Sequence, residues 1–313
     1  MTPNEMIRAL EAGGEYRVLR RFHPAPAYGE VTSGRVGRMC LVDFETTGTE
    51  DDDVPIEIGM VLVEYDMDTC VIGKVLDRYC GQEDPGFPLD PNIVALTHIT
   101  DADLKGKKFD DARVAEIFRQ AGIVVAHKAS FDRGMGERRF AFMADRPWGC
   151  SMNDVPWKEA GIGSVKLEFI ALMKGVYYDA HRADVDAEVT GFILGQEVLD
   201  GKTALWHLLQ RARRKHYRVW ATNSPFSTKD MLKSRSYEWC DGRKYAYKAW
   251  RTETIDLHEE LEFLRTAVYG RRGGEVIVEE LGIKDRFSER REAFEPVQLG
   301  QMSTTGGASS QSS

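Results

Sequence analysis

The stretch that most constrains the fold is "MCLVDFETTG", residues 39–48, where an apolar run ends in two acidic residues. Met39 to Val42 are typical of a strand that is covered on both faces of a sheet. Asp43 and Glu45 follow, and side chains two positions apart on a strand point to the same side. The end of a buried strand therefore presents two carboxylates together, although a strand that simply emerges into solvent would have the same pattern.

Composition allows more than one domain and limits the functional classes. The chain has 313 residues, 42% hydrophobic content and a formal net charge of −8. No apolar stretch approaches the roughly 20 residues of a membrane helix, and the N-terminus lacks the apolar segment of a signal peptide. Five cysteines without a CxxC pair argue against disulfides and a cysteine zinc site, so we expect a cytoplasmic protein without a membrane partner. Because phosphate affinity comes mainly from lysine and arginine, binding to nucleic acid would require a local basic patch or metal ions.

The order of the expected elements indicates a mixed sheet with helices on its faces. Residues 37–45, 55–66 and 71–80 read as three strands, and the turn "DMDT" joins the last two as a hairpin. Helical and apolar segments alternate after them. Helices are expected over 109–122, 131–140, 164–175 and 184–199, and short strands over 123–129 and 147–152.

The character of the chain changes near Gly201, where "ALWHLLQRARRKHYRVW" is basic and aromatic. Aromatic residues alternate on both sides of Asp241-Gly242, the dipeptide of a type I′ turn, which predicts a hairpin over 237–250. A helix is expected over 256–270 from its capping-box spacing. The predicted division is an N-terminal helix and arm at 1–37, a main domain at 38–203, a small α+β accessory domain at 204–285, and a mostly disordered tail at 286–313.

Two further acidic residues lie just beyond other expected elements. Asp132 follows the apolar strand of "AHKASFD", and Asp186 opens a helix in "HRADVD" together with His181. Each alone has an ordinary interpretation, such as a helix cap or an interaction with the helix dipole. Together they place four carboxylates at the ends of three elements, which in an open sheet meet near one edge. Such carboxylates would repel one another unless cations lie between them, and oxygen ligands suit Mg²⁺ or Mn²⁺.

In this order, "DFETTG", "AHKASFD" and "HRADVD" resemble the three motifs of the DEDDh 3′–5′ exonucleases. That group includes the proofreading epsilon subunit of bacterial DNA polymerase III. The resemblance implies a ribonuclease-H-like α/β fold with a five-stranded mixed sheet flanked by helices. It implies two Mg²⁺ ions, for which Mn²⁺ substitutes, held by four carboxylates: Asp43, Glu45, Asp132 and Asp186. Two such ions promote in-line attack on a phosphodiester.

The resemblance also assigns a base and a binding surface for nucleic acid. His181 is implied as the general base, and histidine is the side chain whose ordinary pKa lies nearest neutral pH. The residues implied or expected to contact nucleic acid are Thr46, Thr47, Thr97, His98 and Lys128. The two threonines after the first motif are expected to meet the 3′-terminal nucleotide, whereas the contact in "ALTHIT" is open between its threonine and its histidine. The lysine stands where the family usually has asparagine, and we expect it to contact a phosphate or to offset some acidity.

The accessory segment resembles a small module that is often appended to stand-alone members of this group. Its cations beside aromatic rings in "RARRKHYRVW" suit a surface for single-stranded nucleic acid, although the aromatic residues of the hairpin also suit its own core.

The first functional hypothesis is a two-metal 3′–5′ exonuclease that releases nucleoside monophosphates from single-stranded or frayed 3′ ends of DNA, in proofreading or repair. The alternatives are an exoribonuclease or oligonucleotide-trimming enzyme, and a non-catalytic nucleic-acid-binding accessory protein of replication. No polymerase segment is evident, so coupling to a polymerase or another replication protein would need a partner.

Overall fold

The computed structural model describes residues 1–50, 52–242, 247–270, 273–289 and 296–299. The chain forms two compact units, Met1–Arg213 and Arg214–Ser313. Within the described part, no helix has the length and apolar character that crossing a membrane requires.

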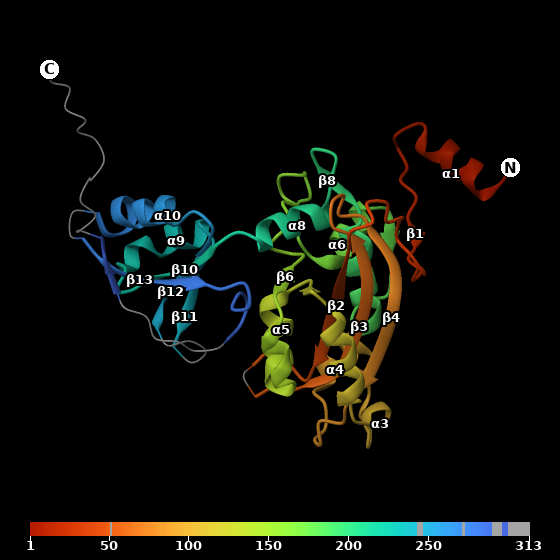
Figure 1. The fold of residues 1–313 in the computed structure, drawn as a ribbon, viewed down its shortest axis with the longest axis horizontal. Helices are drawn as coiled ribbons and strands as arrows, with labels where there is room; N and C mark the ends of the chain where they lie inside the picture. Colours follow the sequence, from red (N-terminus) through yellow and green to blue (C-terminus); the bar gives the residue numbers. More distant parts are fainter. Residues whose placement is uncertain (51, 243–246, 271–272, 290–295, 300–313) are drawn as a thin grey trace. The chain divides into compact units, whose positions relative to one another are not determined.

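The first unit is built on a five-stranded mixed sheet in the order β4-β3-β2-β5-β6 (Figure 1). An antiparallel meander forms one side, with β2 (Val36–Thr46), β3 (Pro55–Asp66) and β4 (Ile72–Gln82). β5 (Ile123–Ala126) pairs in parallel with β2, and β6 (Trp148–Cys150) pairs in parallel with β5. This topology confirms the expected ribonuclease-H-like fold and places β2 at the centre of the sheet.

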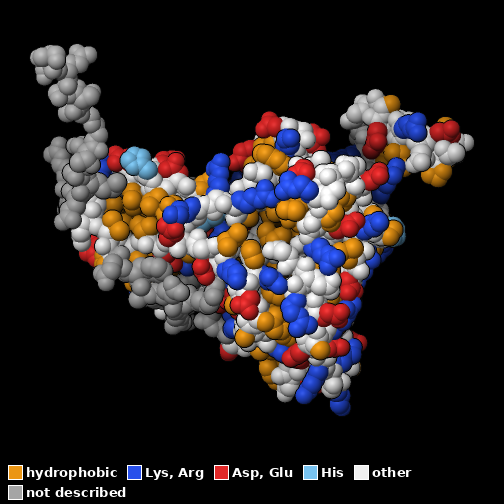
Figure 2. All heavy atoms as spheres, viewed as in Figure 1, with side chains coloured by type: hydrophobic (Ala, Val, Ile, Leu, Met, Phe, Trp, Pro, Cys, Tyr) orange, Lys and Arg blue, Asp and Glu red, His pale blue; other side chains and the backbone are white. Residues whose placement is uncertain are grey.

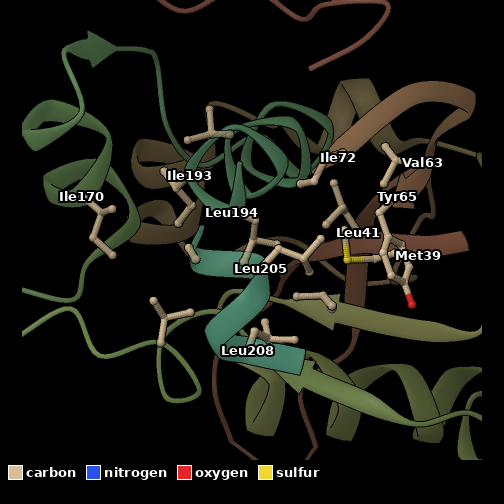
Figure 3. Packing of buried hydrophobic residues seen from close by; sticks show 14 of the residues in the cluster. Met39, Leu41, Val63, Tyr65, Ile72, Ile170, Ile193, Leu194, Leu205 and Leu208 are labelled. Carbon is tan, nitrogen blue, oxygen red and sulfur yellow. The ribbon is translucent and has the colours of Figure 1, made fainter. Parts of the chain in front are cut away.

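Helices cover both faces of β2. Met39 and Leu41 face α7 (Ala183–Leu194) and α8 (Ala204–Ala212), and their side chains interleave in one core (Figure 3). On the opposite face, Phe44 lies beside α5 (Ala129–Arg139). The other helices of this unit are α1 (Pro3–Glu11), α2 (Pro91–Thr97), α3 (Asp101–Leu104), α4 (Asp111–Gln120), α6 (Leu167–Met173) and the 3₁₀ helix η1 (Ala141–Asp145).

The N-terminal arm packs on the first unit. β1 (Arg20–Arg21) pairs in parallel with β7 (Val176–Tyr177), and Phe22 belongs to the main core. The hydroxyl of Tyr28 donates to the carboxylate of Glu188 at 2.6 Å. The arm is therefore held against α7, the helix that contributes to the candidate site. A short hairpin of β8 (Glu197–Leu199) and β9 (Lys202–Thr203) leads into α8.

The second unit is an antiparallel sheet in the order β11-β12-β10-β13-β14. Its core lies on the face that packs against α9 (Lys229–Ser234), α10 (Leu257–Phe263) and the π-helical turn after it (Leu264–Tyr269). A small α+β unit is thus confirmed. Its strands are β10 (His216–Ala221), β11 (Glu238–Asp241), β12 (Lys248–Thr254), β13 (Glu275–Leu281) and β14 (Pro296–Gln298), and a 3₁₀ turn spans Phe226–Thr228.

Two details of the second unit correct the sequence predictions. The predicted boundary after residue 203 is wrong, because α8 buries Leu205, Leu208 and Leu209 in the core of the first unit. The predicted two-residue turn at Asp241-Gly242 is wrong, because Asp241 pairs with Lys248 across a longer loop.

The predicted tail at 286–313 is also ordered in part. β14 pairs with β13, and Leu299 is 1% exposed in the core of the unit. A three-residue strand has too short a pattern to be recognised from alternation. The Gly/Ser-rich part of the predicted tail, 300–313, lies outside the described residues.

Candidate active site

An open cavity of about 610 Å³ lies at the end of β2 in the first unit. Its lining brings together all four predicted carboxylates and the predicted base, from β2, α5, α7 and the loop before α7. The predicted site residues that line it are Asp43, Glu45, Thr46, Thr97, Lys128, Asp132, His181 and Asp186. Two other predicted residues, Thr47 and His98, are not in this lining.

Three of the carboxylates form a tight group. One oxygen from each of Asp43, Glu45 and Asp186 lies within 4.8 Å of the others. Asp132 lies beside them, where its Oδ1 accepts a hydrogen bond from the backbone N–H of Phe44 at 3.2 Å. Its side chain is thereby fixed against the central strand, although it is not part of the three-oxygen group.

The loop before α7 orients Asp186. His181 has a φ of +66°, in the left-handed region, and its N–H donates to Asp186 Oδ2 at 2.8 Å. The N–H of Arg182 donates to the same oxygen at 3.2 Å, and the hydroxyl of Tyr178 donates to Oδ1 at 2.7 Å. His181 therefore lies on the loop and Asp186 in the first helical turn, which is the arrangement that helix periodicity predicts for two residues reaching one site.

Burial and mutual repulsion make ionisation of this group unfavourable. Burial, followed by the charges of the other acidic residues, raises the pKa of Asp43 well above its ordinary value. Burial likewise raises the pKa of Glu45 to about 8 and that of Asp132 to about 7, and it raises the pKa of Asp186. A set of buried oxygen donors with so little compensating positive charge has the chemistry of a site for hard divalent cations such as Mg²⁺ or Mn²⁺.

A fifth acidic residue beside the group has its own cation. Glu57 on β3 lies opposite Glu45 in the strand register and is fully buried. Arg182 donates to it at 2.8 Å, and the N–H of Ala183 donates at 3.0 Å. This carboxylate is therefore engaged in joining β3 to the start of α7. Cys80 and Asp184 lie close to it, but the neighbouring Arg182 already neutralises the buried member of that cluster.

The two residues outside the lining make local contacts instead. The hydroxyl of Thr47 donates to Asp53 Oδ1 at 2.6 Å, which closes the loop after β2. His98 caps α2 with a φ of +56°. Of the pair that the sequence left open, Thr97 lines the cavity, and its hydroxyl donates to the carbonyl of Ile93 at 2.9 Å. The spacing of motifs in the sequence does not predict local hydrogen bonds of this kind.

Several lining residues were not predicted. Tyr178 holds Asp186, and Lys166 and Glu168 frame the cavity from the start of α6. Their only sequence signal is proximity to the third motif and to the segment "VKLEFIA". An apolar wall completes the cavity, and its residues are Ile93, Leu96, Phe131, Met152 and Leu167.

His127 has a structural role. It is 7% exposed, its Nε2 donates to the carbonyl of Val165 at 2.8 Å, and its Nδ1 pairs with the Ser151 hydroxyl at 2.8 Å. Burial lowers the pKa of His127 to about 4, so the ring is neutral at physiological pH. It joins the end of β5 to neighbouring loops, and Lys128, the next residue, faces the cavity.

Residues 41–194 match the family model RNase_T, described as exonuclease. A DNA polymerase III PolC-type protein of Lacticaseibacillus paracasei is 33% identical over 163 residues, covering 49% of this chain and 11% of that protein. The protein of the same name from Listeria innocua is 27% identical over 175 residues, covering 52% of this chain and 11% of that protein. The chain thus spans about a tenth of the length of these relatives.

Solved structures of Exonuclease I are also similar. The E. coli enzyme in complex with a 5cy-dT13 oligonucleotide is 14% identical, with a TM-score of 0.45 over 70% of this chain and 63% of that one. Another structure of Exonuclease I, described as suggesting how processivity is achieved, is 16% identical, with a TM-score of 0.43 over 59% of this chain and 48% of that one.

Proposed function

We propose that the chain is a metal-dependent 3′–5′ exonuclease that releases nucleoside monophosphates from DNA. The match of residues 41–194 to the exonuclease model RNase_T supports this proposal. The observation that carries this proposal is the carboxylate group of the cavity. Oxygens of Asp43, Glu45 and Asp186 lie within 4.8 Å of one another, and Asp132 and His181 line the same cavity.

The four carboxylates would hold two divalent cations, Mg²⁺ in the first instance and Mn²⁺ as a substitute. Bound cations of this kind stabilise the charge that develops on the attacking and leaving oxygens of an in-line displacement. The protein supplies the rest: β2 fixes Asp43 and Glu45, and three hydrogen bonds from Tyr178, His181 and Arg182 fix the orientation of the Asp186 carboxylate. Rigid placement of this kind keeps the site organised before the substrate binds.

His181 is proposed as the general base that takes the proton of the attacking water. Its ring belongs to a loop whose backbone is tied to Asp186, so its position is coupled to that of a proposed ligand. The apolar wall, with Phe131 and Leu96, would offer a surface for the terminal base. Lys128 and Thr46 line the same cavity and would meet its phosphate and sugar. A single-stranded or frayed end suits such a cavity, because a base must leave the stack to contact an apolar wall.

DNA is the proposed substrate class, and replication is the proposed context. The relatives at 27–33% identity are DNA polymerases by name, which favours DNA over RNA and favours proofreading with a polymerase partner. All five cysteines are free thiols, which suits the cytoplasm.

The test is a cleavage assay with end-labelled single-stranded DNA, duplex DNA with a frayed 3′ end, and RNA. Each substrate is incubated with Mg²⁺, with Mn²⁺ or with a chelator. A 5′-labelled DNA strand should shorten stepwise from its 3′ end only when a divalent cation is present. An Asp43→Asn variant, purified in the same way, controls for contaminating nucleases. Shortening that is equal in the variant, or no shortening with either cation, would overturn the proposal.

A further inference from the structure

The basic run that the sequence offered for nucleic-acid binding is largely engaged in ion pairs. Arg218 is 3% exposed and donates to Glu279 at 2.9 Å and to Glu253 at 3.0 Å inside the second unit. Lys215 pairs with Glu280 at 2.7 Å. Arg211, on α8, pairs with Asp154 at 3.4 Å. These cations stabilise the fold, so the expectation that "RARRKHYR" forms the binding surface loses its main support.

A different surface of the second unit combines cations with exposed rings. We call it the α9 platform, and it consists of Phe226, Lys229, Lys233, Trp239 and Trp250. The Lys229 ammonium lies 4.5 Å from the centre of the Phe226 ring, and the Lys233 ammonium lies 5.9 Å from that of Trp250. Trp250 packs edge-on against Trp239 at 5.6 Å across the β11–β12 pair. The two lysines are four residues apart on a helix, so they share one side of α9.

Two of the three rings of the platform are exposed, whereas Trp250 is partly buried against the core of the second unit. Phe226 is 81% exposed beside Lys229, and Trp239 is 52% exposed beside Trp250, the ring that Lys233 contacts. Exposed apolar groups on one surface are typical of interaction sites. Figure 2 shows hydrophobic side chains gathered over α9 and α10 with lysine or arginine beside them. In the described part of the chain, neither Lys229 nor Lys233 forms an ion pair with a carboxylate.

We propose that the α9 platform binds single-stranded nucleic acid. Its rings would stack on bases, and Lys229 and Lys233 would neutralise the phosphates between them. Stacking platforms flanked by cations are how proteins bind single strands without reading sequence. A duplex hides the faces of its bases, so it could use the two lysines but not the rings. Glu238, the residue before Trp239 on β11, is paired with Arg251 at 3.6 Å, which limits its repulsion of a phosphate.

This surface goes beyond the proposed nuclease activity, because it lies in the second unit and shares no residue with the cavity. A strand held there would remain at high local concentration for the first unit, since the two are joined in one chain. Long strands would gain from this tether, whereas an oligonucleotide too short to reach both surfaces would not.

The test measures binding by the full-length protein in a chelator, so that cleavage plays no part. Fluorescence anisotropy with a labelled long oligothymidylate gives the dissociation constant. Loss of one stacked base should weaken binding about 5- to 150-fold in Trp239→Ala and in Phe226→Ala. Trp239→Phe keeps a ring and should bind within a few-fold of the unaltered protein. Phe226 is so exposed that its replacement should leave the melting temperature unchanged, which separates binding from folding.

The lysines are tested by salt dependence. Removing two phosphate contacts in the Lys229→Gln, Lys233→Gln double variant should flatten the slope of log K against log salt by about 1.4 for a single strand. The matched controls lie in the first unit, where Tyr16, Lys74 and Lys158 are exposed. Tyr16→Ala, and the pair Lys74→Gln with Lys158→Gln, should change neither affinity nor slope.

Two outcomes would overturn the proposal. Unchanged affinity in both ring variants would leave the platform as a contact surface for a protein. If the control variants lose as much affinity as the platform variants, binding depends on total charge or on exposed apolar area. Because all of these measurements are made without metal, they stand whether or not the cleavage assay succeeds.

Discussion

Replacing Glu45 by glutamine should stabilise the metal-free protein at neutral pH, although it removes a proposed metal ligand. The side chain of Glu45 is buried, with 8% exposed. Burial is the first cause that raises its pKa from 4.5 to about 8, and repulsion from Asp186 and Glu57 follows. The charged form is therefore unfavourable in the folded state, and glutamine has nearly the same shape without the charge.

The magnitude follows from linkage between protonation and folding. In the unfolded chain the carboxyl loses its proton near pH 4.5, whereas in the folded protein it keeps it up to about pH 8. The stability that the protonated form contributes is complete below the lower value and is lost progressively as the pH rises from there through the upper one. At neutral pH the free energy of unfolding is lowered in this way by at most about 3 kcal/mol. For a unit of this size, that corresponds to a melting temperature about 6 to 12 °C higher in Glu45→Gln.

Glu57→Gln is the matched control. This carboxylate faces Glu45 across the β2–β3 pair and is equally buried, but it accepts hydrogen bonds from Arg182 and from the N–H of Ala183. Replacing Glu57 by glutamine removes the charge from the hydrogen bonds that Arg182 and Ala183 donate to it, so this variant should lose stability. The two substitutions, chemically identical and on adjacent strands, should therefore shift stability in opposite directions.

The assay is thermal unfolding followed by circular dichroism, in a chelator, from about pH 4.5 to about pH 8. The advantage of Glu45→Gln should be near zero at the acidic end and grow with pH. Adding Mg²⁺ or Mn²⁺ should stabilise the unaltered protein more than the variant, because binding to the native state adds to its stability. A variant less stable than the unaltered protein in chelator, or a difference independent of pH, would refute the reasoning.

Three further predictions concern the site and the unit boundary. Asp43→Ala and Asp186→Ala should each lower turnover at least about 10²-fold with the fold intact by circular dichroism, and near-normal rates would contradict the metal assignment. His181→Asn should lower turnover about 10²- to 10⁴-fold, and a higher pH should restore part of it. Asparagine is chosen because it tolerates the left-handed backbone at this position. The control is His258→Ala in the second unit, where the histidine is exposed, and an unchanged rate in His181→Asn would show that another group takes the proton. A fragment that ends after α8 should melt cooperatively. One that ends before α8 should lose several kcal/mol of stability, because removal of the buried leucines of α8 leaves a cavity in the core. Equal melting temperatures for the two fragments would contradict the boundary.

The candidate site could be anticipated because each of its carboxylates is attached to a strong local pattern. Asp43 and Glu45 follow an apolar run, and a strand with a period of two fixes their common direction. His181 and Asp186 lie on either side of the start of a helix, so the helix period fixes which one lies on the loop. Once the elements are known, the topology of an open sheet brings their ends together.

Other features depend on contacts that no local pattern specifies. Thr47 follows the first motif as directly as Thr46 does, yet its hydroxyl is taken by Asp53 six residues later. The helix α8 is basic in composition, but the leucines on one of its sides belong to the first core rather than to the domain that follows. The loop between β11 and β12 contains the dipeptide of a tight turn, and the register of the two strands overrides that preference.

The contacts of the lysines and arginines in the second unit show why a run of basic residues is weak evidence for a nucleic-acid surface. Arg218 stands in the densest basic run, but its partners Glu253 and Glu279 lie 35 and 61 residues away, and folding buries Arg218 together with Glu279. Lys229 and Lys233 belong to no such run, yet they lie beside the rings of Phe226 and Trp250 and outside any described ion pair. Electrostatic attraction to a polyanion depends on which cations remain uncompensated after folding, rather than on how many stand together in sequence. A protein with a formal charge of −8 can therefore hold a single strand if two uncompensated lysines and two exposed rings lie on one surface, and the ring substitutions separate that arrangement from total charge.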